Sequence, residues 1–148
     1  MSDGDESAGW FGPDQQQGLQ DFWRIYDQHY ASILADTLRV AREHPEFAPI
    51  VAAMSSEQIE TQNREGHERL RRAVGGAWAA YEAELRQQGS AYANLGISFT
   101  GWYDLVGAFK QDMVLLLIAE LGGDLEWLAG ALRVLHCFVD RTMRIIGE

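Results

Sequence analysis

The sequence has one cysteine, few basic residues and no long apolar run, and each scarcity removes a class of protein. Cys137 is the single cysteine among 148 residues, which excludes an internal disulfide and a multi-cysteine zinc site and is typical of a reducing cytosol. The longest apolar run, residues 113–119, is far shorter than the roughly 20 residues of a membrane-spanning helix. The acidic first residues lack the basic and apolar regions of a secretory signal. We therefore expect a cytoplasmic domain.

The charge balance is strongly acidic. Twelve Lys and Arg residues stand against 22 Asp and Glu residues, a formal net charge of −10. This charge repels phosphate backbones and anionic lipid, so we expect neither nucleic acid nor a membrane as partner. Hydrophobic residues make up 47% of the chain, enough for one core. We predict one domain, residues 15–148, behind a flexible leader of small and polar residues, 1–14, from which Trp10 and Phe11 dock loosely on the domain.

Apolar residues recur at spacings of three and four along most of the chain, a pattern that predicts helices and no strands. The first helix is predicted to run from Leu19 to about Arg42 and to end before Pro45 and Pro49, because proline cannot continue a helix. Ser55, followed three residues later by Gln58, has the pattern of a capping box. A second helix should therefore begin there.

Glycine and N-cap residues divide the rest of the chain into helices. Gly75-Gly76 should end the second helix, Gly96 the third, and Thr100 should cap the fourth. Gly122-Gly123-Asp124 should end the fourth helix and start the last, which is predicted from Leu125 to the chain end. The predicted fold is all-α, with five long helices, of which the last two form a tight antiparallel hairpin.

The two helices of this hairpin carry more apolar residues than one core can bury. A helix of about 23 residues is roughly 35 Å long, so two such helices from each of two chains can form a four-helix interface. The alternative is a monomer in which both helices are central. Because an exposed apolar patch of that size favours aggregation, we predict a homodimer. Its predicted interface residues are Met113, Leu117, Leu128, Leu132, Leu135, Val139 and Met143.

Between residues 57 and 147, a series of short segments stands in a fixed order. These segments are the polar helix 62–74 with Glu68-Arg69-Leu70-Arg71-Arg72-Ala73, Trp78-Ala-Ala-Tyr81, Gly89-x-x-Tyr92-x-x-Leu95-Gly96-Ile97, Trp102-Tyr103, and the ending from Phe138-Val139-Asp140-Arg141 to Ile146-Gly147-Glu148. Together they resemble the globin-like sensor domains at the N-termini of bacterial signalling proteins. The resemblance implies a globin-like helical fold.

Tyr92 decides which branch of that family the chain resembles. In globin-coupled sensors the matching position holds the histidine that binds haem iron. A tyrosine phenolate can bind ferric iron, but a pKa near 10 makes that costly without a nearby cation. The resemblance therefore implies a non-haem domain with no expected cofactor, similar to the RsbR-type domains of stressosome proteins and to domains that precede histidine kinases. Relatives with this fold have been associated with fatty-acid-like ligands.

Six residues are expected to line what remains of the ligand pocket. They are Tyr30, Phe47, His67, Tyr81, Tyr92 and Trp102. His67 is the best placed of the four histidines, although a solvent-facing position in its charged run is the alternative. We expect His29 on the polar side of the first helix, His44 at a helix end, and His136 in the core or interface.

The sequence offers no support for catalysis or a metal site. No nucleophile elbow of the G-x-S-x-G type is present. The pairs Glu57/Glu60, Glu82/Glu84 and Asp124/Glu126 lack the Glu-x-x-His pattern of di-iron bundles, so we expect surface charges. The expected domain has no catalytic residues.

The sequence-based hypothesis is a dimeric, non-haem sensory domain of a sensor histidine kinase or stressosome regulator. Its input would shift the last two helices and act on an output domain after Glu148, and through it on other signalling proteins. The chain ends in an apolar run, residues 143–146, as expected of a domain cut from a longer protein. Two alternatives remain: a haem-binding gas or redox sensor, and a purely structural interaction module.

Overall fold

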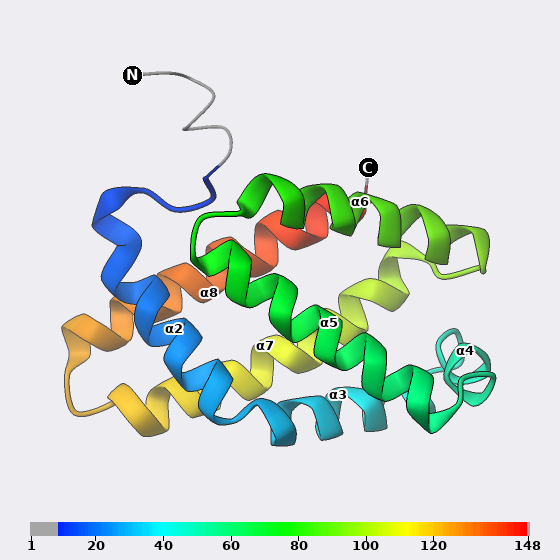
Figure 1. The fold of residues 1–148 in the computed structure, drawn as a ribbon. Coiled ribbons are helices and arrows are strands. Elements are labelled where there is room, and N and C mark those ends of the chain that lie inside the picture. The colour runs from blue at the N-terminus through cyan, green and yellow to red at the C-terminus, as the bar shows by residue number, and fades with distance from the viewer. Residues whose placement is uncertain (1–8, 148) are drawn as a thin grey trace.

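The computed structural model describes residues 9–147, and every regular element in this range is a helix (Figure 1). A 3-10 turn precedes seven α-helices: η1 (Pro13–Gln15), α2 (Gln16–Gln28), α3 (Tyr30–Glu43), α4 (Ala48–Ala52), α5 (Ser56–Val74), α6 (Trp78–Asn94), α7 (Phe99–Leu121) and α8 (Leu125–Ile146). The all-α prediction is confirmed. Within residues 9–147, every helix is too short or too polar to span a lipid bilayer.

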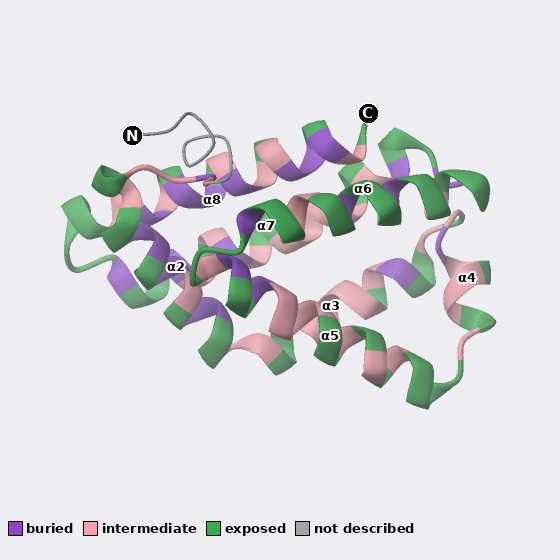
Figure 2. Cartoon of the chain, turned by 45° about the horizontal axis from the view of Figure 1, so that its top comes forward, coloured by how far each residue is buried: buried purple, intermediate pink, exposed green. Residues whose placement is uncertain are grey.

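Helix α8 is the centre of the fold. It packs against α2, α6 and α7, and α3 packs along α7, as the contacts of His29 with Glu120 and of His44 with Asp104 show. Its buried residues Ala131, Val134, Leu135 and Phe138 are spaced by three and four, so they form one stripe that faces the core. Figure 2 shows this burial as purple turns along α8, whereas the outer turns of α6 are green. Full burial of each large apolar side chain contributes about 1.5–3 kcal/mol.

The predicted caps at Ser55 and Asp124 and the predicted glycine turns are confirmed. Ser55 Oγ accepts from the Gln58 amide at the start of α5, and the Gln58 side chain accepts in return from the Ser55 amide. Gly76 and Gly96 have φ values of 126° and 96°, a region that other residues rarely adopt. Asp124 caps α8, and Figure 1 shows the tight turn from α7 into α8 at the left of the view.

The single helix predicted from Leu19 to Arg42 is wrong, because the structure breaks it at His29. This residue has φ −106° and ψ 17°, outside the helical region, and its Nε2 lies 3.2 Å from Glu120 Oε2 on α7. The break lets α2 lie along α8 and α3 lie along α7. A straight helix could not follow both.

The predicted cap of α7 at Thr100 is also wrong. Ser98 is the N-cap, and its Oγ accepts from the Gly101 amide at 3.0 Å. The Ser98 amide and hydroxyl both donate to Glu46 Oε1, at 2.9 and 3.0 Å. This tertiary contact from the α3–α4 turn fixes the start of α7 two residues early.

In the described part of the predicted leader, Trp10 is packed more closely than the loose docking expected of it. Trp10 is 8% exposed and stacks on Trp78 with ring centroids 4.7 Å apart. Its Nε1 donates to Glu82 Oε1 at 3.3 Å, and the Arg141 guanidinium lies 5.4 Å from its ring. Phe11 contacts the edge of Trp78. The rest of the predicted leader, 1–8, lies outside the described residues.

Helices α2 and α8 touch backbone to backbone at Gly18. A Cβ atom at Gly18 would lie 2.6 Å from the carbonyl oxygen of Gly130. Only a residue without a side chain allows this approach. The contact fixes where α2 crosses α8.

Candidate functional site

A cleft of about 280 Å³ lies among helices α2, α3, α5, α6, α7 and α8. Six residues make up most of its inner wall: Ile33, Leu70, Leu85, Phe109, Phe138 and Thr142. The exposed polar residues Gln62, Glu84 and Gln88 stand at its rim. An apolar interior with a polar rim is the usual make-up of a small-molecule site.

The six predicted pocket residues fall into two separate groups. Tyr30, His67 and Tyr81 line the cleft. Phe47, Tyr92 and Trp102 do not, and belong instead to a second apolar cluster at the N-terminal end of α7. In this cluster the Trp102 ring lies 5.4 Å from both the Phe47 and the Tyr92 rings. The aromatic pattern could not separate the groups, because both present rings to an interior.

His67 is held in place by neighbours on α2 and α3. Its Nε2 lies 2.8 Å from Asp27 Oδ1, and its ring centroid lies 4.0 Å from that of Tyr30 and 5.4 Å from that of Trp23. The side chain is 26% exposed, so it is not the freely solvated residue that its charged neighbours suggested. A carboxylate already engages one of its two ring nitrogens.

The tyrosine hydroxyls of the cleft are neutral groups. Burial raises the pKa of Tyr81 above its ordinary value of 10.0, and burial together with neighbouring charges does the same for Tyr26. Burial also raises the pKa of Tyr30, whose hydroxyl donates to the Asn63 carbonyl at 2.6 Å. These groups remain protonated at neutral pH.

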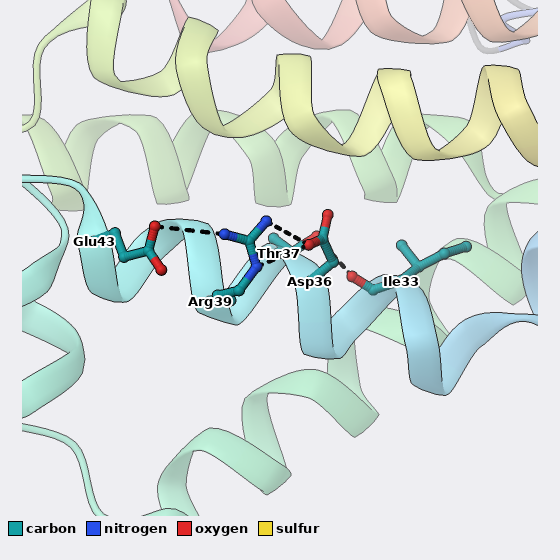
Figure 3. Close-up of polar contacts among 5 residues, drawn as sticks. All are labelled: Ile33, Asp36, Thr37, Arg39 and Glu43. Atoms are coloured by element: carbon teal, nitrogen blue, oxygen red, sulfur yellow. Dashed lines mark hydrogen bonds and ion pairs between the residues drawn. The ribbon is translucent and has the colours of Figure 1, made fainter.

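Thr142 carries a buried hydroxyl without a partner. The residue is 7% exposed, and its Oγ1 makes no hydrogen bond within the described part of the chain. Thr37, on the opposite wall, is different: its Oγ1 donates to the Ile33 carbonyl at 2.9 Å (Figure 3). Nearly all buried polar atoms in proteins are paired, so the Thr142 hydroxyl needs an explanation.

The charged groups around the cleft are compensated. Arg69 Nε lies 2.9 Å from Glu84 Oε2. On α3, Arg39 pairs with Asp36 at 2.7 Å and with Glu43 at 3.4 Å, outside the cleft lining (Figure 3). The described lining therefore offers no cation that lacks a carboxylate partner.

A carboxyl pair links α3 to α7. Burial, followed by a hydrogen bond to Asp36, raises the pKa of Asp112 to about 6. The pKa of Asp36 is lowered by its hydrogen bonds to Asp112 and Arg39. Sequence reasoning missed this pair because the two residues are far apart in the chain.

The cleft residues do not fit a haem group. Tyr92 stands at the expected iron-ligand position but lies outside the cleft lining, and His67 is engaged by Asp27.

The carboxylate pairs considered as metal sites have other contacts. Glu82 pairs with Arg86 and Arg141, and Asp124 caps α8. Among residues 9–147, no three His, Cys, Asp or Glu side chains come together in a group that could hold a metal ion.

The remaining histidines lie at the surface or near it. His44 Nε2 lies 3.1 Å from Asp104 Oδ2, and its Nδ1 accepts from the Glu46 amide, so it joins the α3–α4 turn to α7. His136 is exposed in the single chain, not in its core. It borders a groove with Tyr103 and Val139 on the outer side of α7 and α8.

Four of the seven predicted interface residues are covered within one chain. Met113, Leu117, Leu135 and Met143 are 0%, 0%, 1% and 8% exposed. The other three are partly buried: Leu128, Leu132 and Val139. The uncovered apolar surface of the hairpin is formed instead by residues that sequence reasoning did not select, including Tyr103, Leu115, Ile118 and Leu125. These residues lie on the side of the two helices that faces away from the buried stripe, and the apolar spacing of the sequence did not show which side that is.

No protein-family model matches the chain, and no curated protein matches it either.

Proposed function

We propose that this chain is a dimeric, non-haem sensory domain with a globin-like arrangement of helices, which passes a ligand-dependent change through α7 and α8 to an output domain of a bacterial signalling protein in the cytoplasm. One observation carries the proposal. Phe109 on α7 and Phe138 and Thr142 on α8 line the cleft, while the outer side of the same helices bears apolar surface that no other part of residues 9–147 covers.

This outer surface is continuous enough to receive a second helix pair. On α7, Tyr103, Lys110, Val114 and Ile118 are spaced by seven, four and four residues, which places them on one stripe. Tyr103 is 64% exposed and Ile118 is 47% exposed. On α8, a matching stripe is formed by Leu125, Leu128, Leu132, His136 and Val139. Leu125, at 77%, is the most exposed large apolar residue of the hairpin.

An interface of standard size on this surface would be enough for a stable dimer. An interface of about 800 Å² per chain, at about 25 cal/mol per Å² for its apolar part, gives roughly 20 kcal/mol before association costs of about 4–15 kcal/mol. Two copies of the hairpin related by a two-fold axis would bury each stripe against its equivalent. The aggregation hazard of an exposed stripe is removed in the same step.

Signal transfer follows from the two sides of the same helices. A ligand in the cleft contacts the inner side of α7 and α8, and the interface occupies their outer side. A ligand can shift the balance between two packings of the hairpin only by its difference in affinity for them. A displaced α8 would then present a changed helix end to the output domain.

The oligomeric state tests the proposal directly. We expect sedimentation velocity to give a dimer, and the double variant Ile118→Glu with Leu132→Glu to give a folded monomer, because dimerisation of the variant would bury carboxylates at two apolar positions of each stripe pair. Leu95→Glu is the matched control: Leu95 is 62% exposed in the turn before α7, away from both stripes. A monomeric wild-type chain, or a double variant that remains dimeric, contradicts the proposed interface.

Transfer to α8 is tested separately. Spin labels at Arg144 of each chain should change their separation when the cleft is filled, and labels at Arg24 on α2 should change less. An unchanged distance at residue 144 with a filled cleft would leave a dimer that does not signal, which is the behaviour of a structural interaction module.

A further inference from the structure

One lining residue of the cleft, Thr142, has a buried hydroxyl group without a hydrogen-bond partner among the described residues. Helical threonines commonly satisfy their hydroxyl by donating to the carbonyl four residues earlier, as Thr37 does to Ile33. Thr142 makes no such bond to Phe138, although it lies on a regular stretch of α8. Its Oγ1 is buried in the wall of the cleft with both its proton and its lone pairs unused.

The walls around this hydroxyl suit an apolar body. Leu85 and Phe138 are 8% and 6% exposed, and both line the cleft with Phe109 and Leu70. The volume of about 280 Å³ admits about nine non-hydrogen atoms at about 30 Å³ each. A molecule of that size can fill the cleft and lie against Thr142, which is one of the lining residues.

The electrostatics of the lining argue for a neutral ligand. Arg69 is paired with Glu84, and His67 lies 2.8 Å from a carboxylate oxygen of Asp27. The raised pKa of Tyr81 keeps its hydroxyl uncharged. A ligand carboxylate would enter an apolar interior without a spare cation to meet it, and burial of an unpaired charge is strongly unfavourable.

We propose that the cleft binds a small, uncharged molecule with an apolar body of about eight or nine non-hydrogen atoms and one hydroxyl or carbonyl group, which pairs with the Thr142 hydroxyl. This assignment rests on the proposed sensory function and makes its ligand specific. It differs from the fatty-acid-like ligand that the sequence resemblance implies, because the carboxylate is the group that the lining does not accommodate.

Octan-1-ol and octanoate form a matched pair of probes, since they share chain length and differ in charge. Isothermal titration calorimetry on the full chain near neutral pH should show saturable binding of octan-1-ol. Octanoate should bind at least about tenfold more weakly, since its charge must be buried without a counter-ion. Equal or tighter binding of octanoate overturns the proposal.

Two variants locate the alcohol at the proposed atom. Thr142→Val keeps the branched shape and removes the hydroxyl, and should weaken octan-1-ol binding about three- to tenfold, the range expected for one neutral hydrogen bond. Thr37→Val removes a cleft hydroxyl that is already satisfied by Ile33, and should leave the affinity within about twofold of wild type. Equal weakening by both variants, or by neither, overturns the assignment to Thr142.

Thermal unfolding gives an independent readout. Without alcohol, Thr142→Val should melt at a higher temperature than wild type, because it no longer buries an unpaired hydroxyl, while the rise in melting temperature caused by octan-1-ol should be smaller. If this variant fails to fold, the octan-1-ol and octanoate comparison on the wild-type chain still decides the proposal.

Failure of the inference can be distinguished from failure of the proposed function. A dimer that binds neither probe overturns the ligand assignment and leaves the interface intact. A monomer that binds octan-1-ol in a Thr142-dependent manner supports the ligand assignment and overturns the dimeric function.

Discussion

Trp10→Ala provides the most demanding test of the fold, because the sequence pattern predicts only loose docking of this residue and the structure places it in the core. The indole is 8% exposed, stacks on Trp78 and meets the rings of Tyr81 and Phe138 at 5.5 and 5.9 Å. It also donates a hydrogen bond to Glu82. The variant removes all of these contacts and leaves Trp78 facing a gap.

The expected loss can be worked out from these contacts. A buried tryptophan covers about 150–250 Å², which at about 25 cal/mol per Å² corresponds to roughly 4–6 kcal/mol. That value is an upper bound, because the unfolded chain also buries apolar surface. Release of the segment before η1 returns about 1–2 kcal/mol of backbone entropy for each freed residue. We expect a net loss of about 2–3 kcal/mol in the free energy of unfolding.

Urea denaturation at fixed protein concentration measures this loss. With a slope of about 1–3 kcal/mol per molar urea, the midpoint should fall by roughly 1 M without a change in slope. The melting temperature should fall by about 5–10 °C. Trp127→Ala is the control, since Trp127 is 48% exposed near the start of α8. A loss at Trp10 below about 1 kcal/mol, or no larger than at Trp127, refutes the packed arrangement.

Three further predictions concern single contacts. Gly18→Ala should lower the free energy of unfolding by about 1–2 kcal/mol, because the added Cβ would meet the Gly130 carbonyl. Gly130→Ala should raise it by up to about 1 kcal/mol, because the added Cβ meets nothing within 4 Å, and urea denaturation of both variants measures the two effects. Burial and the neighbouring Asp36 raise the pKa of Asp112 in the folded state from 3.8 to about 6, so its ionisation near neutral pH opposes folding. Asp112→Asn removes this charge and should stabilise the fold near neutral pH by about 1 kcal/mol after solvent screening. Because the folded state binds this proton more tightly than the unfolded state, the free energy of unfolding of the wild type should rise relative to that of Asp112→Asn as pH falls from about 7 to 4. A difference between the two proteins that does not change with pH contradicts this account. Asp124→Ala should cost about 1 kcal/mol and reduce helicity by circular dichroism, because two α8 amides lose their acceptor.

Local chemistry made much of the helical outline predictable. The Ser55 and Gln58 capping box and the glycines at 76 and 96 act through their immediate neighbours, so sequence spacing is enough to place them. Asp124 at the start of α8 belongs to the same class. In each case the satisfied groups lie within about four residues of the side chain that satisfies them.

The missed features depend on contacts distant in the chain. The break at His29 goes with its contact to Glu120, and the cap at Ser98 with its bonds to Glu46. Trp10 is buried by residues more than 60 positions away. Periodicity identified the apolar face of α7, but it could not tell that Leu117 points inward while Ile118 remains uncovered.

The candidate site was predictable in part, for a similar reason. Tyr30, His67 and Tyr81 line the cleft, whereas Tyr92 belongs to a different cluster, a division that residue spacing alone does not reveal. The sequence gives no reason to single out Thr142, because the hydroxyl of a threonine within a helix usually donates to a backbone carbonyl of the same helix. Only the three-dimensional arrangement reveals a hydroxyl left without that bond.

The glycine crossing of α2 and α8 limits how α8 can move. Because the backbones of Gly18 and Gly130 are already in contact, α8 cannot come closer to α2 there, and a tilt of α8 about this crossing would move its far end most, where the Ile146 backbone lies against Gly89 of α6. At about 1.5 Å per residue, Ile146 lies about 24 Å along α8 from the crossing at Gly130, and Thr142 lies about 18 Å from it. A tilt of about 5° about the crossing would therefore move the far end of α8 by about 2 Å. A ligand that displaces α8 near Thr142 would act about 18 Å from the crossing.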